Sequence, residues 1–170
     1  MNSTDAPNDE DAIAELKYRY VRYLDTKQWD ALRDLLTEDA TASYGGGAYV
    51  CDGREEMIDF LVTNMGSETM HSSHRVGQPE IDVSGDSATG RWALSDTVLD
   101  VTLGVLISGA AYYEDTYVRR DDHWLIASTG YRRLYEYLIP TSSVADFSLT
   151  ASWWGTDGRS MLPLSGQGRG

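Results

Sequence analysis

Apolar residues in the first part of the chain recur at helical spacing. Residues 12–24 place an apolar side chain every three or four positions, and an acidic run precedes them, as suits the positive end of a helix dipole. The pattern predicts a first helix there. Two shorter helices follow by the same spacing, over residues 29–36 and 55–65, and the last should stop at Gly66. Because only a short turn joins the first two, we expect them to pack together.

The pattern then changes to that of strands. Two short extended pieces flank a glycine run near residue 46, and four long segments rich in β-branched and aromatic residues follow, separated by turn residues. These long segments are residues 70–83, 88–101, 105–119 and 124–137. They predict an antiparallel meander. Helices followed by long hairpin strands indicate an α+β fold, with the helices packed on one face of a strongly curved, mostly antiparallel sheet that encloses an apolar pocket.

The chain divides near Pro140. A length of 170 residues with 41% hydrophobic residues predicts a single domain, which we place at residues 1–140. Residues 141–170 are rich in Ser and Gly but carry Phe147, Trp153 and Trp154, too much aromatic surface for a linker. We expect this tail to dock, either as a lid or on a neighbouring subunit. An open sheet face and an aromatic tail together favour a homo-oligomer, a dimer or a trimer.

Charge and cysteine content narrow the partners. The formal net charge of -13 repels phosphate backbones and anionic lipid, and no local basic patch opposes it, so we expect neither nucleic acid nor a membrane as partner. Cys51 is the sole cysteine, which rules out an intrachain disulfide and agrees with a reducing compartment. No apolar run approaches the roughly twenty residues of a membrane span. We therefore expect a cytoplasmic protein.

Asp25 is the first candidate for a chemical role. It directly follows Leu24 at the end of the predicted first helix, and it shares with Tyr18 and Val21 a stripe that flanks the apolar face. A carboxylate here meets the unfavourable end of the helix dipole. Its position alone fits a site residue and a cap for the following helix equally well.

Strand parity distinguishes two of the three histidines. His71 and His74 are an odd number of residues apart, so they point to opposite faces of a regular strand. The residues that share a face with His74 are Met70, Ser72 and Val76. This half-apolar face makes His74 the pocket candidate, although such a histidine is also a common core residue. If Asp25 and His74 meet, the carboxylate would fix the imidazole tautomer and leave the other ring nitrogen to take or give a proton near neutral pH.

Tyrosines supply candidate hydrogen-bond donors. A phenol in an apolar pocket can donate to a carbonyl oxygen that gains negative charge during proton abstraction. The candidates are Tyr18, Tyr20, Tyr44, Tyr112 and Tyr113. Most of them would serve as core aromatics whose hydroxyls reach the surface. The sequence has no glycine-rich phosphate loop with a following Lys, no His-x-x-x-His pair and no Gly-x-Ser-x-Gly elbow, so it predicts neither a cofactor nor a metal.

One motif carries a family resemblance. Residues 20–32, YVRYLDTKQWDAL, resemble the first-helix signature of the SnoaL-like, scytalone dehydratase-like group in the nuclear transport factor two-like superfamily. The resemblance continues through residues 73–77, SHRVG, and the turn at residues 122–124, and covers roughly residues 12 to 137. It implies a cone-shaped α+β barrel.

The resemblance also implies roles for residues. In this family an aspartate that ends the first helix and a histidine from the sheet share an apolar cone and act on ring substrates without a cofactor; here these are Asp25 and His74. Tyr20 matches a tyrosine five residues before the aspartate, and Tyr44 a second-strand tyrosine that holds a water near the substrate carbonyl. The expected substrate-binding set is Tyr20, Tyr44, Trp92, Tyr113 and Arg133.

The sequence departs from the family pattern at several site positions. Leu24 stands where scytalone dehydratase has a tyrosine, and Val98 stands near its second site histidine. Tyr113 and Asp115 fall near its serine and asparagine. These changes leave the substrate open.

The sequence therefore predicts a cofactor-independent dehydratase or isomerase acting on a cyclic hydroxy-ketone, polyketide or steroid-like molecule, with His74 as general acid and base and Asp25 orienting it. A non-catalytic binding protein for a hydrophobic metabolite, and a structural subunit like the small partner of ring-hydroxylating dioxygenases, remain alternatives.

Overall fold

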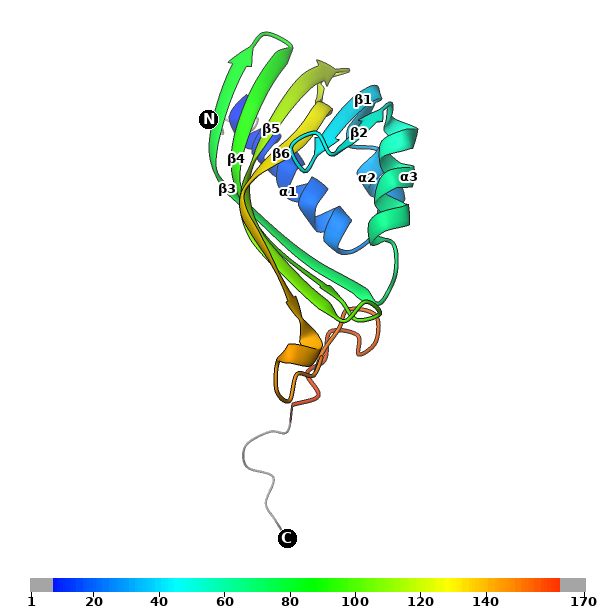
Figure 1. The fold of residues 1–170 in the computed structure, drawn as a ribbon. Coiled ribbons are helices and arrows are strands. Elements are labelled where there is room, and N and C mark those ends of the chain that lie inside the picture. The colour runs from blue at the N-terminus through cyan, green and yellow to red at the C-terminus, as the bar shows by residue number, and fades with distance from the viewer. Residues whose placement is uncertain (1–7, 163–170) are drawn as a thin grey trace, which may run out of the picture.

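The computed structural model describes residues 8–162. It shows three helices on the concave side of one strongly curved sheet (Figure 1). This is the cone-shaped α+β architecture that the sequence predicted. Within the described residues, no helix is both long enough and apolar enough to cross a membrane.

Six strands form a mixed sheet in the order β2-β1-β6-β5-β4-β3. Their bounds are Leu36–Tyr44 (β1), Tyr49–Asp52 (β2), Met70–Ser84 (β3), Ser87–Asp100 (β4), Val105–Arg120 (β5) and His123–Pro140 (β6). The strands β3 to β6 are the predicted antiparallel meander. Strand β1 pairs antiparallel with β2 and parallel with β6, which joins the first third of the chain to the last strand.

The first helix forms because its apolar stripe faces the sheet. Helix α1 spans Asp9–Asp25, and the side chain of Asn8 caps it by accepting a hydrogen bond of 2.7 Å from the backbone N–H of Asp11. The buried residues at helical spacing are Ile13, Leu16, Tyr20 and Leu24. Helix α3 spans Arg54–Met65 and packs against β1 and β2. The helices therefore cover one face of the sheet only, as predicted.

The second helix is shorter than the sequence predicted. Helix α2 spans Trp29–Arg33, and by Leu36 the chain has entered β1. Leu36 pairs with Ile126 of β6, whose backbone N–H donates to the carbonyl of Leu35 at 2.9 Å. The prediction of helix through residue 36 was wrong because a short apolar run satisfies both the helix and the strand period. Leu35 therefore fills the core from the turn before β1, and Leu36 from the strand itself.

Bulges bend the long strands around the helices. The register shifts in the β5–β6 ladder at Ala110/Ala111 and again at Thr116/Tyr117, and in the β3–β4 ladder between Gly77 and Glu80. An extra residue in one strand bends it and increases its twist. The long strands consequently sweep past the helices, as Figure 1 shows. The helices lie on the concave face of these strands, where the candidate site is found.

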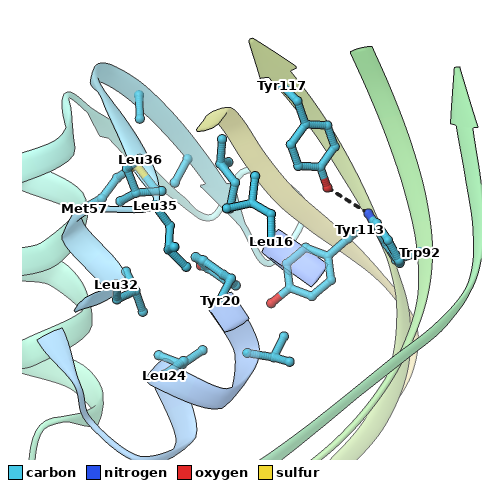
Figure 2. Packing of buried hydrophobic residues seen from close by; sticks show 14 of the residues in the cluster. Leu16, Tyr20, Leu24, Leu32, Leu35, Leu36, Met57, Trp92, Tyr113 and Tyr117 are labelled. Atoms are coloured by element: carbon cyan, nitrogen blue, oxygen red, sulfur yellow. Dashed lines mark hydrogen bonds between the residues drawn. The ribbon is translucent and has the colours of Figure 1, made fainter. Parts of the chain in front are cut away.

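Residues from α1 and the sheet meet in the core. Figure 2 shows Leu16 and Tyr20 of α1 beside Tyr113 of β5, with Trp92 of β4 to the right of Tyr113. Leu32, Leu35, Leu36 and Met57 fill the opposite side. Each of these side chains is buried.

The tail returns to the start of β3. After a short 3-10 turn at Thr141–Ser143 it has no regular structure up to Leu162. The Trp154 ring centroid lies 5.9 Å from that of His71, and the Lys27 ammonium nitrogen lies 4.4 Å from the Trp154 centroid. The tail thus contacts both the end of α1 and the edge strand of the sheet.

Candidate active site

Asp25 and His74 are in direct contact. The Nδ1 atom of His74 lies 2.6 Å from Asp25 Oδ1, and the backbone N–H of His74 donates to Asp25 Oδ2 at 2.8 Å. The Ser72 hydroxyl donates to Oδ1 at 2.8 Å. One strand thus supplies three hydrogen bonds to the carboxylate that ends α1. Because the Asp25 carboxylate engages Nδ1, Nε2 is the nitrogen left for a ligand.

The carboxylate of Asp25 is held in its charged form. Burial would raise its pKa, but the hydrogen bonds from His74 and Ser72 and the charge of His74 together outweigh burial, so the pKa lies below its ordinary value of 3.8. The cap alternative has no support among the described residues, since α2 has no side-chain capping bond at its N-terminus. Asp25 is therefore positioned to orient His74.

His74 lines an apolar chamber between α1, α3 and the sheet. We use "chamber" for this cavity of about 200 Å³, which is lined by Tyr20, Leu24, Tyr44, Tyr49, Phe60, Leu61, Asn64, Met65, His74, Tyr113 and Tyr131. The His74 side chain is 8% exposed. The chamber walls are aromatic and aliphatic side chains whose polar groups are the tyrosine hydroxyls, the amide of Asn64 and the imidazole of His74, a make-up that suits a small ring compound with a polar substituent.

Two tyrosines form a hydrogen-bonded pair in the chamber wall. The hydroxyl oxygens of Tyr20 and Tyr44 lie 2.9 Å apart. Burial raises the pKa of both phenols well above the ordinary value of 10, so both stay protonated. Only one proton can lie between the two oxygens, which leaves the second free to reach a ligand. This pair can stabilise negative charge on a carbonyl oxygen.

Of the remaining predicted binding residues, only Tyr113 lines the chamber. The indole N–H of Trp92 donates to the Tyr117 hydroxyl at 2.9 Å, within the core (Figure 2). The guanidinium of Arg133 pairs with both oxygens of Asp96, at 2.5 and 2.9 Å. Since Asp96 is the cross-strand partner of His74, Arg133 lies on the same face of the sheet but outside the chamber lining.

The structure adds site residues that the sequence analysis did not identify. Ser72 donates to Asp25, and its parity with His74 was a sequence signal for this. Phe60 stacks on Tyr44 with centroids 5.6 Å apart, and Tyr131 meets Tyr113 edge-on at 5.6 Å. Phe60 and Tyr131 join the chamber through pairings between distant elements, for which the local pattern carries no signal.

A buried ion pair lies beneath the chamber. The Lys17 ammonium is 2.7 Å from Asp115 Oδ2, and neither side chain is exposed. Thr129 and Tyr117 donate their hydroxyl protons to the same carboxylate, each at 2.7 Å. Lys17 also lies 3.4 Å from the centroid of Tyr113. Burial lowers the pKa of Lys17, while Asp115 opposes that shift. This network fixes the ring of Tyr113 from behind.

The fold and this site define the class of protein. A cone of helices and curved sheet, with a carboxylate and an imidazole meeting at an apolar chamber, is the architecture expected from the resemblance. A SnoaL-like domain model matches residues 6–130, and the chain belongs to that family.

Individual relatives are similar at low identity. The probable cyclase FGR4 of Gibberella zeae is 24% identical over 140 residues, which cover 75% of this chain and 92% of the cyclase. A candidate scytalone dehydratase from Novosphingobium aromaticivorans superposes with a TM-score of 0.69 at 22% identity, covering 89% of this chain and 94% of its own. The hexachlorocyclohexane dehydrochlorinase LinA-type3 from Novosphingobium barchaimii has a TM-score of 0.70 at 21% identity, with 82% and 92% covered. These structures share the fold.

Proposed function

We propose that the chain is a cofactor-independent dehydratase or isomerase that acts on a small cyclic hydroxy-ketone in the chamber. The observation that carries the proposal is the His74–Asp25 contact of 2.6 Å at the edge of an apolar, tyrosine-lined cavity. The names of the similar proteins, a dehydratase, a dehydrochlorinase and a cyclase, support small-molecule chemistry of this kind.

The proposed reaction begins with proton abstraction. His74 Nε2 takes a proton from the carbon beside the substrate carbonyl, and the electron pair of that C–H bond moves to form an enolate. The Tyr20–Tyr44 pair donates a hydrogen bond to the enolate oxygen, and Asp25 stabilises the imidazolium. In a dehydration, the enolate re-forms the carbonyl as the β C–O bond breaks, and His74 returns the proton to the departing hydroxyl, giving water. In an isomerisation, His74 returns it to another carbon.

A simple probe tests this chemistry. 3-Hydroxy-1-tetralone loses water to give 1-naphthol, whose formation is followed by fluorescence. We expect His74→Gln to lower kcat by about a hundred- to ten-thousandfold, the usual contribution of general acid–base catalysis, and Asp25→Asn to lower it by a smaller factor. Ser73→Ala is the matched control, because Ser73 lies between Ser72 and His74 on β3 but is exposed. Unchanged turnover in both site variants would refute the mechanism.

The same assay distinguishes the proposed enzyme from a non-catalytic binding protein. A non-catalytic pocket for a hydrophobic metabolite is favoured by the aromatic lining of the chamber. If the protein binds the tetralone and related cyclic hydroxy-ketones saturably but turns none of them over, it is a binding protein and not an enzyme for this class of compound.

A further inference from the structure

A second cavity lies on the other side of Asp25. We use "tail cleft" for this space of about 280 Å³, which is lined by residues of the tail, of β3 and of the end of α1. The residues that matter here are Asp25, His71, Ser72, Ala151, Trp153 and Trp154. We infer that the tail cleft is a second ligand subsite, which takes an uncharged ring fragment carrying a hydroxyl group.

The positions of the two cavities support this inference. His74 lines the chamber, whereas Asp25, which contacts His74, and Ser72, which donates to Asp25, line the tail cleft. The His74–Asp25 pair therefore lies between the two cavities. A cavity of about 150 Å³ already accommodates a benzene ring, so either space holds a ring-sized group. Each is smaller than the roughly 300–1,000 Å³ of ordinary ligand pockets, so each suits a ring-sized fragment rather than a larger molecule.

The polar atoms of the cleft select a hydroxyl group. Asp25 Oδ1 accepts two hydrogen bonds, from Ser72 and His74, whereas Oδ2 accepts one, from the backbone of His74. A carboxylate oxygen has room for two donors, so Oδ2 retains one acceptor site. The Asp25 side chain is 19% exposed. A ligand hydroxyl in the cleft can therefore donate to the carboxylate that orients His74.

The two charges next to the cleft offset each other. Asp25 is negative, and the ammonium of Lys27 is fixed beside the cleft: it donates to the carbonyls of Met65 and Met70, at 2.7 and 3.0 Å, and lies against Trp154. The cleft therefore presents no net charge that would favour an ion of either sign over a neutral group. The indole rings of Trp153 and Trp154 offer flat apolar surface to a ring. A neutral, hydroxylated ring matches all three features. The inference goes beyond the proposed reaction, since such a group can bind here whether or not the chamber is catalytic.

Three probes with one ring system test the inference. 2-Indanol is neutral, 2-aminoindane is a cation and indane-2-carboxylate is an anion. We expect 2-indanol to shift the indole N–H resonance of Trp154, identified by its loss in Trp154→Phe, and to bind at least about tenfold more tightly than either ion. Equal affinity for the three probes, or a Trp154 resonance that does not respond to 2-indanol, would overturn the inference.

Two variants locate the probe. Trp154→Ala should lower the affinity for 2-indanol by about tenfold. Ala151→Phe should abolish its effect on Trp154 by filling the cleft while leaving the tryptophan in place. Phe147→Ala is the matched control, an exposed aromatic of the same tail outside the cleft lining, and should bind as the wild type does. Wild-type affinity in both cleft variants would place the probe elsewhere. Because no turnover is measured, this result is independent of whether the dehydratase proposal holds.

Discussion

Asp25 shows how one side chain joins two elements. It is the last residue of α1, but its carboxylate is saturated on one oxygen by groups of β3 rather than by its own helix. The sequence carried two clues to this contact: a carboxylate at the wrong end of a helix dipole, and the parity that set His74 apart from His71. The sequence carried no such clue for Trp92, whose indole N–H donates to Tyr117 in the core. A buried aromatic residue on a strand fits a core position and a substrate-binding position equally well.

The hydrogen bonds to Asp25 make stability depend on pH. Its pKa in the folded protein lies below 3.8, whereas an unfolded aspartate titrates near 3.9, so the stabilisation is fully present above the unfolded value and is lost as pH falls through the folded one. Asp25→Asn removes this dependence. We expect the wild type to be more stable than the variant in urea at about pH 6, and the difference to shrink towards about pH 3.

The exposed Asp59 on α3 supplies the control for this titration. Asp59→Asn removes the same charge from a side chain that has no part in the Asp25 contacts. Its stability difference from wild type should change much less between the two pH values. A parallel pH response of the two variants would show that net charge, and not the contact with His74, determines the effect.

At the scale of elements, the long strands were the easiest part to predict. Their β-rich runs end at turn residues that take positive φ values, 61° at Gly85 and 49° and 65° at Asp121 and Asp122. Helix α2 was overextended, and the parallel pairing of β1 with β6 was not predicted. Both failures concern non-local contacts: nothing in residues 36–44 specifies a partner some ninety positions away, as the pairing of Leu36 with Ile126 shows.

Gly109 lets β5 and β6 approach beside the candidate site. A Cβ at Gly109 would lie 2.5 Å from the carbonyl oxygen of Tyr135 and 3.3 Å from the Arg133 guanidinium. Gly109→Ala should therefore lower the free energy of unfolding by about 1–3 kcal/mol, the usual cost of overpacking. Gly77→Ala on β3 is the matched control, since a Cβ there meets nothing within 4 Å. Urea unfolding measures the stability of both variants. If Gly109→Ala were as stable as Gly77→Ala, the β5–β6 ladder would accommodate the added Cβ without strain.

At the scale of the whole molecule, one buried ion pair ties the helical layer to the sheet. The Nζ atom of Lys17 on α1 lies 2.7 Å from Asp115 Oδ2 on β5, and both side chains are fully buried. Each charge therefore offsets the free-energy cost of burying the other. An apolar pattern predicts that α1 packs on the sheet, but it cannot predict that one buried position on each side is charged. The pair joins α1, which ends at Asp25, to β5.

Removing one partner of this pair should cost more than removing both. Lys17→Met leaves Asp115 charged and buried, and we expect a loss of about 3–5 kcal/mol in the free energy of unfolding. In Lys17→Met/Asp115→Asn both charges are gone, while the amide oxygen still accepts from Thr129 or Tyr117. The double variant should therefore be more stable than Lys17→Met alone. Urea unfolding of both single variants and the double variant completes the cycle. Strictly additive losses would show that the two charges do not depend on one another.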